Sequence, residues 1–317
     1  MRKADSPKDF VNFSNHPKRK LPVKVVFYAL FFLVLSAGLM LFFRGTRDSQ
    51  WDGKSRLTVI SISPAGLISY EPQNREVLLI SFPSNFMLSL TNGYGDYYFD
   101  RVFELDRQEK KQGRLVISSV ENEFGIQVIS WVNQKTPRQM IPSLADLVLG
   151  NVKSNFSTFD LVRFVWLING AKKIDIRNVD LSAEDLIRAK DNVDGSVSLV
   201  LAGDRWDSWV RTNMFDKAID EERLTITVIN KTNRQGLGTK AARLFENLGA
   251  QVVRVVSGNE VIDGCIVRGE KRVEQSQTVK AIKHLFSCSW QTGDSNSERA
   301  DVVVYLGEDY WRLLYGQ

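Results

Sequence analysis

Hydrophobic residues first gather in an uninterrupted run near the start of the chain. The nineteen residues from Val25 to Phe43 carry no charge, and at about 1.5 Å per helical residue they cover about 28 Å, close to the hydrocarbon thickness of a bilayer. A cleaved signal peptide is the alternative, but its apolar region is shorter and ends at small residues. Here the run continues past Ser36, Ala37 and Gly38. We therefore predict an uncleaved transmembrane anchor at 23–43 and a linker at 44–55.

The C-terminal third alternates short β-type runs with helical patterns. Apolar positions there recur at the spacing of strands and then of amphipathic helices. The order predicts a small β-α-β-β-α-β domain. The expected strands are 224–230, 250–256, 265–269 and 300–307, and the expected helices are 236–248 and 274–286.

The middle of the chain has an α/β pattern of its own. Two β-type runs, 56–63 and 76–83, flank a turn-bearing segment, so we expect adjacent strands. Helical spacing follows at 113–126, ending at a glycine, and again from Ser157 to Gly170. Residues 172–181 predict a further strand, so the fold class is α/β throughout.

The net positive charge of the chain lies at its N-terminal end. The 317 residues carry a formal charge of +5 and 43% apolar residues. Residues 1–24 hold seven basic and two acidic residues, so the remaining 35 basic (42 − 7) and 35 acidic (37 − 2) residues cancel. A neutral body lacks the electrostatic footprint of a nucleic-acid-binding domain. By the positive-inside rule, the basic residues Lys18, Arg19, Lys20 and Lys24 place a tail at 1–22 in the cytoplasm. The bulk of this single-pass cell-membrane protein is then extracytoplasmic.

The run Gly236-Leu-Gly238 has the spacing of a dinucleotide-binding turn. In such turns the first glycine follows the strand almost directly, whereas residues 231–235 intervene here. We expect the start of a structural helix and no nucleotide.

The C-terminal region resembles the C-terminal domain of the LytR-CpsA-Psr cell-envelope family. The resemblance lies in the order of the elements and in two stretches, "ITVINKTNRQGLGTKAARLFENLGAQVV" and "ADVVVYLGEDYW". The resemblance covers about residues 223–311 and places a domain of this type at 223–317. It implies an extracytoplasmic domain with no established catalytic residues.

A second segment, "VLLISFPSNFML" at 77–88, is similar to the family's strand followed by Ser-Ile-Pro-Arg-Asp, and it places a LytR-CpsA-Psr-like domain at 56–222. The resemblance implies that active members grip a polyprenyl-linked pyrophosphate with arginines, hold a divalent metal with acidic residues, and transfer the glycopolymer to the envelope. Here Ser84 and Asn85 stand at the arginine and aspartate positions, and Arg56 is the best upstream arginine. Serine and neutral asparagine replace such charges poorly. We therefore expect a degenerate domain without catalytic residues, cofactor or metal.

Two functions stay open on the sequence. The first is a non-catalytic envelope protein that binds or scaffolds cell-wall glycopolymer or an envelope protein. The second is an active, Mg²⁺-dependent glycopolymer phosphotransferase whose ligands come from positions such as Arg101, Arg107 or Asp106. The transcriptional attenuator of the family's historical label is disfavoured by the expected topology.

Three remaining features have chemical and structural interpretations. Trp206 and Trp209 could stack sugars, but aromatic residues at helical spacing usually pack against a core. The segment 191–195 resembles part of a calcium loop and lacks its glutamate, so we expect a hairpin turn. The only two cysteines, Cys265 and Cys288, bracket a predicted strand and helix, and outside the cytoplasm we expect a disulfide rather than two buried thiols.

The predicted topology has a direct test. Because the basic cluster precedes the apolar run, protease added to intact cells with accessible envelopes should remove the C-terminal domain. An immunoblot against the C-terminus measures this loss. Complete protection of that domain would contradict the orientation.

Overall fold

The computed structural model describes residues 28, 32, 36, 49–135, 139–170, 175–294 and 298–315. The chain divides into two units, Met1–Arg47 and Asp48–Gln317. The predicted anchor at 23–43 lies outside the described residues, except for three helical positions. Within the described part of the chain, no helix combines the length and apolar character that a membrane crossing needs.

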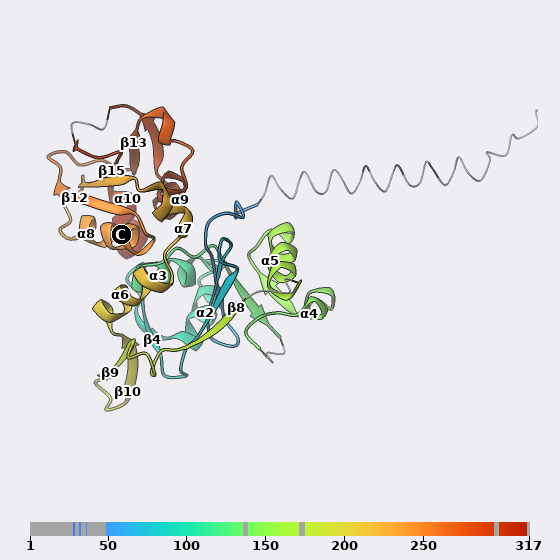
Figure 1. The fold of residues 1–317 in the computed structure, drawn as a ribbon. Helices are drawn as coiled ribbons and strands as arrows, with labels where there is room; N and C mark the ends of the chain where they lie inside the picture. Colours follow the sequence, from blue (N-terminus) through green and yellow to red (C-terminus); the bar gives the residue numbers. More distant parts are fainter. Residues whose placement is uncertain are drawn as a thin grey trace, which may run out of the picture. The chain divides into compact units, whose positions relative to one another are not determined.

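A six-stranded sheet organises the middle domain in the order β7-β6-β1-β2-β3-β8. Figure 1 shows this domain, with the edge strand β8 labelled. β1, β2 and β3 form an antiparallel meander, while β6 and β8 join its two sides in parallel. Parallel pairing requires a crossover, which the intervening helices supply. The strands are β1 Leu57–Ser61, β2 Gly66–Glu71, β3 Glu76–Ser81, β6 Ser130–Gln134, β7 Val152–Ser154 and β8 Asp175–Asp180.

The expectation that 56–63 and 76–83 pair directly is wrong. β2 lies between them and pairs with both β1 and β3. Its residues, GLISYE, are all buried, and its apolar and aromatic side chains suit a strand better than a turn. The proline and polar residues on either side of β2 make the two turns.

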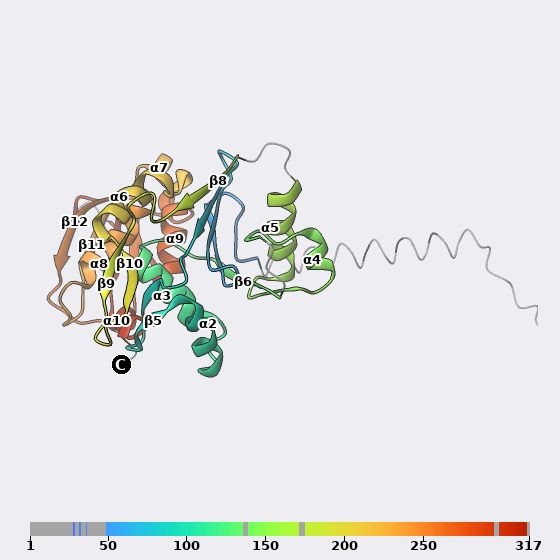
Figure 2. The ribbon, with the colours of Figure 1, turned by 90° about the horizontal axis from the view of Figure 1, so that it is seen from below.

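Helices cover both faces of this sheet (Figure 2). Successive strand residues point to opposite faces, so Ile60 packs with α3 residues in one core and Val59 packs with α5 residues in the other. The predicted helix ends are confirmed: α3 is followed by Gly125 at φ 62°, and Ser157 accepts the backbone N–H of Asp160 at the start of α5. The helices are α2 Phe99–Gln108, α3 Arg114–Phe124, α4 Leu144–Val148, α5 Thr158–Gly170, α6 Gly203–Asn213 and α7 Lys217–Glu222.

Two hairpins complete the domain. β4 Met87–Leu90 pairs with β5 Gly95–Tyr98, and β9 Ile187–Asp191 pairs with β10 Val197–Leu201. The segment 191–195 is therefore the expected hairpin turn. Residues 49–55 were expected to form a linker, but this segment packs against the middle domain. Trp51 is 3% exposed and lies in the same core as residues of α5.

The C-terminal domain has a five-stranded sheet in the order β12-β11-β15-β13-β14. The predicted element order is present, and β14 and α10 extend it. β14 has four residues, SWQT, whose short polar sequence carries no apolar periodicity. The elements are β11 Thr225–Asn230, α8 Leu237–Asn247, β12 Gln251–Ser257, β13 Ile266–Gly269, α9 Gln277–Phe286, β14 Ser289–Thr292, β15 Val302–Leu306 and α10 Glu308–Tyr315.

The glycine run at 236–238 begins helix α8. Gly236 has φ 81° and caps the helix, a conformation that glycine adopts without steric cost. Leu237, Ala241 and Phe245 are buried in the C-terminal core. The run is a helix start, as expected from the length of the preceding loop.

Partly buried polar contacts join the two domains. Arg243 of α8 donates to the carbonyls of Asn122 (3.0 Å) and Glu123 (2.9 Å), and its Nε lies 2.7 Å from Asp207 Oδ2. Ile219 of α7 is buried in the C-terminal core, so that core begins before residue 223.

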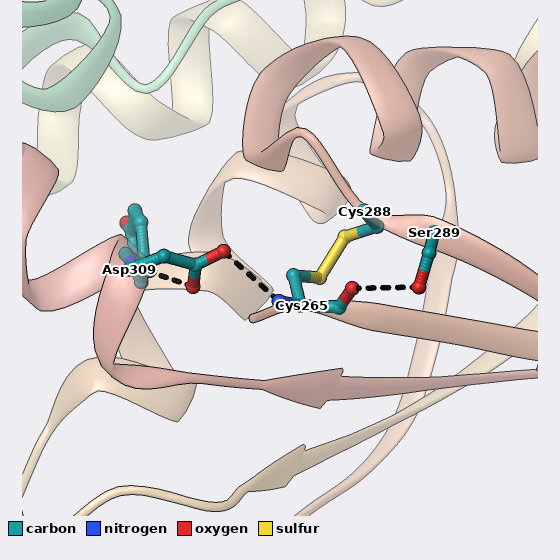
Figure 3. Close-up of a disulfide and its surroundings, with 5 residues drawn as sticks. Cys265, Cys288, Ser289 and Asp309 are labelled. Atoms are coloured by element: carbon teal, nitrogen blue, oxygen red, sulfur yellow. Dashed lines mark hydrogen bonds between the residues drawn. A yellow bond between two sulfur atoms is a disulfide. The ribbon is translucent and has the colours of Figure 1, made fainter. Parts of the chain in front are cut away.

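A disulfide joins Cys265 to Cys288 (Figure 3). The two residues directly precede the parallel neighbours β13 and β14, with Ile266 opposite Ser289. Their Cα atoms are 4.4 Å apart. The Cys265 N–H also donates to Asp309 at 2.9 Å, so the bridge and α10 hold the same strand end.

Removing this bridge should destabilise the C-terminal domain. The cysteines are 23 residues apart, and cross-linking a loop of this size stabilises by about 3 kcal/mol through the unfolded state. Cys265→Ala with Cys288→Ala should lower the free energy of unfolding by about that amount in urea titrations. Reduced wild-type protein is the control and should match the double variant. Two titratable thiols in native protein from its own envelope would contradict the bridge.

Candidate functional site

The loop after β3 holds the two positions where the sequence resemblance places the family's charges. Ser84 is exposed. The Asn85 side chain donates to Val197 O at 3.3 Å, and the Asn85 backbone carbonyl accepts the Leu199 N–H at 3.0 Å. Asn85 therefore ties the loop to β10, and neither side chain presents a charge.

Phe82 and Phe86 fix this loop from either side. Their rings lie 4.9 Å apart and stacked, and both side chains are buried. Aromatic pairs of this kind stabilise a backbone path through burial and ring contact. Ser84 and Asn85 thus occupy a rigid loop with a structural role.

The residues named as alternative ligands for a phosphotransferase, Arg101, Arg107 and Asp106, do not form a common site. Arg101 is exposed, 3.7 Å from Asp100, and Arg107 is exposed and paired with Glu104 at 2.6 Å. Asp106 is buried and accepts the backbone N–H groups of Gly113 (2.6 Å) and Leu115 (2.9 Å). Asp106 satisfies donors at the start of α3, where a helix has unpaired N–H groups.

Arg56 lies at the opposite end of the sheet from Ser84. β1 and β3 are both antiparallel to β2 and so run in the same direction. Arg56 precedes β1, whereas Ser84 follows β3, and the six residues of β3 alone span about 20 Å. Arg56 and Ser84 therefore do not share a site.

Arg56 is the centre of a buried charge network. Its Nε lies 3.3 Å from Glu71 Oε2 and donates to Phe215 O at 2.9 Å, and its Nη1 donates to Ser69 at 3.1 Å. Its backbone N–H donates to Asp216 at 2.8 Å. The two side chains of the ion pair are 7% and 1% exposed. Burial lowers the pKa of Arg56 and raises that of Glu71, and the opposite charge opposes each shift.

A polar cavity of about 230 Å³ opens beside this network. Glu71 and Glu76 are directly opposite each other on β2 and β3, where like charges repel. Arg56 offsets the first glutamate, and Arg177 lies 3.7 Å from the second. Sequence reasoning missed Glu71, Glu76 and Arg177, although the charged ends of two apolar strands were a visible signal.

Every cation that lines the cavity already has a partner. Arg177 donates to Asn213 at 2.7 Å, and Lys217 donates to Asn74 at 3.2 Å. Among the described residues, no cluster of three or more His, Cys, Asp or Glu side chains could hold a metal. The lining holds three cations and two carboxylates, so one positive charge is in excess.

The tryptophan pair packs internally, as the helical spacing predicted. Trp206 is fully buried and its Nε1 donates to Phe124 O at 2.6 Å. Trp209 stacks on it at 5.4 Å. Trp206 belongs to the core beneath α6.

A buried carboxyl of α3 lies near the C-terminal domain. Desolvation raises the pKa of Glu121 to about 8, although its Oε1 accepts the Val128 N–H at 2.9 Å. Glu121 is therefore mostly neutral near pH 7, which limits the cost of removing it from water.

Comparison with known proteins identifies the C-terminal domain. Residues 223–310 match the family described as LytR cell envelope-related transcriptional attenuator, which confirms the sequence resemblance there. No curated protein matches the chain.

Solved structures similar to this chain include LytR-CpsA-Psr family proteins. Bacillus subtilis TagT is 13% identical with a TM-score of 0.36, covering 50% of this chain and 89% of that chain. B. subtilis TagU is 11% identical with a TM-score of 0.32, covering 49% and 92%. A protein of Enterococcus faecalis, EF0465, is 11% identical with a TM-score of 0.33, covering 62% and 87%.

The Arg56–Glu71 pair should matter for stability. Arg56→Met leaves Glu71 buried without its partner, so unfolding titrations should show a loss of about 3 to 5 kcal/mol. Arg56→Met with Glu71→Leu should recover most of it, because no buried charge remains. Arg107→Met, at an exposed ion pair, is the matched control and should change little. An equal loss of unfolding free energy in the Arg56 and Arg107 variants would show that the buried ion pair stabilises the fold no more than an exposed one.

Proposed function

Residues 223–310 of the chain belong to the LytR cell envelope-related family, and from this premise we propose a membrane-anchored, extracytoplasmic envelope protein that does not catalyse transfer. It binds or scaffolds cell-wall polymer or an envelope partner. Its anchor is the apolar run at 23–43, with the tail at 1–22 in the cytoplasm. The disulfide between Cys265 and Cys288 supports this location, since such bridges persist outside the reducing cytoplasm.

One observation carries the non-catalytic proposal: the charged groups that phosphoryl transfer needs are far apart and already occupied. Arg56 is buried against Glu71 at one end of the sheet, and the loop at the other end presents Ser84 and Asn85. Arg101 pairs with Asp100 on the surface. Transfer depends on preorganised charge around the developing phosphate charge and on a shared metal ion.

A binding or scaffolding role is supported by how the domains are joined. Asp216 and Arg243 link the middle and C-terminal parts through charge-assisted contacts, which are buried at Asp216 and partly buried at Arg243. Such bonds are stronger and more directional than neutral ones. They favour an extracytoplasmic part that holds a partner in a constant orientation.

The purified full-length chain should show no Mg²⁺-dependent transfer or hydrolysis of a polyprenyl-pyrophosphate glycan. Each lost charge-assisted contact removes about 1.5 to 3 kcal/mol of phosphate stabilisation, and the metal ligand is lost with it. Radiolabelled product release measures this, with an active family member as the positive control. Robust turnover that disappears in Arg56→Ala, Arg101→Ala or Arg107→Ala would restore the phosphotransferase alternative and its Mg²⁺ cofactor.

A further inference from the structure

Exposed apolar side chains gather on two adjacent helices of the middle domain. On α4 and the residue after it, Val148 is 86% exposed and Leu149 is 71% exposed. On α5, Trp166 is 60% exposed and Val162 is 47% exposed. α4 and α5 lie side by side in both views (Figures 1 and 2). We call Leu144, Val148, Leu149, Val162 and Trp166 the outer apolar surface.

Packing within the domain does not account for this surface. The inner face of α5 supplies Phe164, Val165 and Ile168 to the core. Val162 and Trp166, one turn apart, lie on the outer face. A helix that is apolar on most sides ordinarily has apolar surroundings on most sides. We therefore expect the outer face of α5 to contact a second apolar environment outside the domain.

In the proposed topology, the length of chain between the anchor and α5 limits how far this surface can lie from the membrane. Ser49 Oγ donates to Asp160 Oδ1 at 2.6 Å, and the Gln50 N–H donates to Asp160 Oδ2 at 2.7 Å, in the first turn of α5. Ser49 is six residues after Phe43, the end of the proposed anchor. Six extended residues reach at most about 20 Å.

The attachment point and the apolar surface share one helix. Trp166 follows Asp160 by six residues, which is about 9 Å along the helix axis. Arg163, between them, lies over the Trp51 ring at 4.4 Å and strengthens the attachment. A short tether raises the effective concentration of a weak binding surface at its target, so a modest apolar area suffices for contact.

We propose that the outer apolar surface rests in the headgroup region of the bilayer that carries the anchor, with Trp166 at the boundary of the hydrocarbon. Tryptophan is enriched at this depth because its ring is apolar and its N–H is polar. Aliphatic side chains from an adjoining short helix enter the same boundary. The proposal rests on the anchored topology given above, and it fixes which side of the middle domain faces the lipid.

Fluorescence quenching by lipids with brominated acyl chains tests the contact. The full-length chain is reconstituted in phosphatidylethanolamine–phosphatidylglycerol vesicles, and its tryptophan emission is compared with and without bromine. Quenching should be largely lost in Trp166→Phe. Trp290→Phe, at a half-buried residue of the C-terminal domain, is the control and should keep the quenching.

A second pair of variants leaves every tryptophan in place. Val148→Glu with Leu149→Glu puts charges on the outer apolar surface without touching the core, and it should reduce the quenching of Trp166. Val193→Glu, at a fully exposed position on the β9–β10 turn, is the matched control and should not. Both variants should keep the wild-type unfolding midpoint.

Three outcomes would overturn the proposal. Unquenched Trp166 in a chain that resists alkaline extraction would refute the lipid contact while the anchor stands. Alkaline extraction of the chain would refute the anchor and the contact together. Concentration-dependent dimers in detergent that shield Trp166, without quenching in vesicles, would assign the surface to a second copy of this chain.

Discussion

The buried carboxylate of Asp216 is the contact on which the arrangement of the domains depends. It accepts the Arg56 N–H at the entrance to β1 and the N–H groups of Ala218 (2.9 Å) and Ile219 (3.4 Å) at the start of α7. One side chain therefore fixes the first strand of the middle sheet and the helix that enters the C-terminal core. Burial raises the pKa of Asp216, and these donated hydrogen bonds lower it. The donors compensate for the desolvation that a buried carboxylate suffers.

The same constraint decides how the arginines of this chain are used. Arg56 cannot leave Glu71 without leaving a buried carboxylate unpaired, and Arg243 contacts two backbone carbonyls and Asp207. Both side chains serve the structure. The cavity next to Arg56 is polar, and both of its carboxylates are paired with arginines.

In the proposed topology, the segment at 49–55 connects the anchor in sequence to the core around α5. Trp51 is buried beside α5, so the chain joins the domain within a few residues of the proposed span. The C-terminal core is held separately by the Cys265–Cys288 bridge and by Asp309. In the proposed topology, the middle domain touches the lipid and the C-terminal domain carries the family's identifying sequence.

Local signals in the sequence determined the helices α3, α5, α8 and α9 and about half of the described strands, namely β1, β3, β8, β11, β12, β13 and β15. Gly125 and Ser157 mark helix ends because a left-handed glycine and a capping hydroxyl act within one turn of the chain. The pairing of the only two cysteines and the C-terminal β-α-β-β-α-β order were equally readable. The tertiary structure alone decided that β2 separates β1 from β3, that Arg56 and Ser84 lie at opposite ends of the sheet, and that Glu71 is the partner of Arg56. These features depend on the order and direction of the strands. Strand order and direction bring residues together that are distant in the sequence, and local periodicity does not predict such contacts.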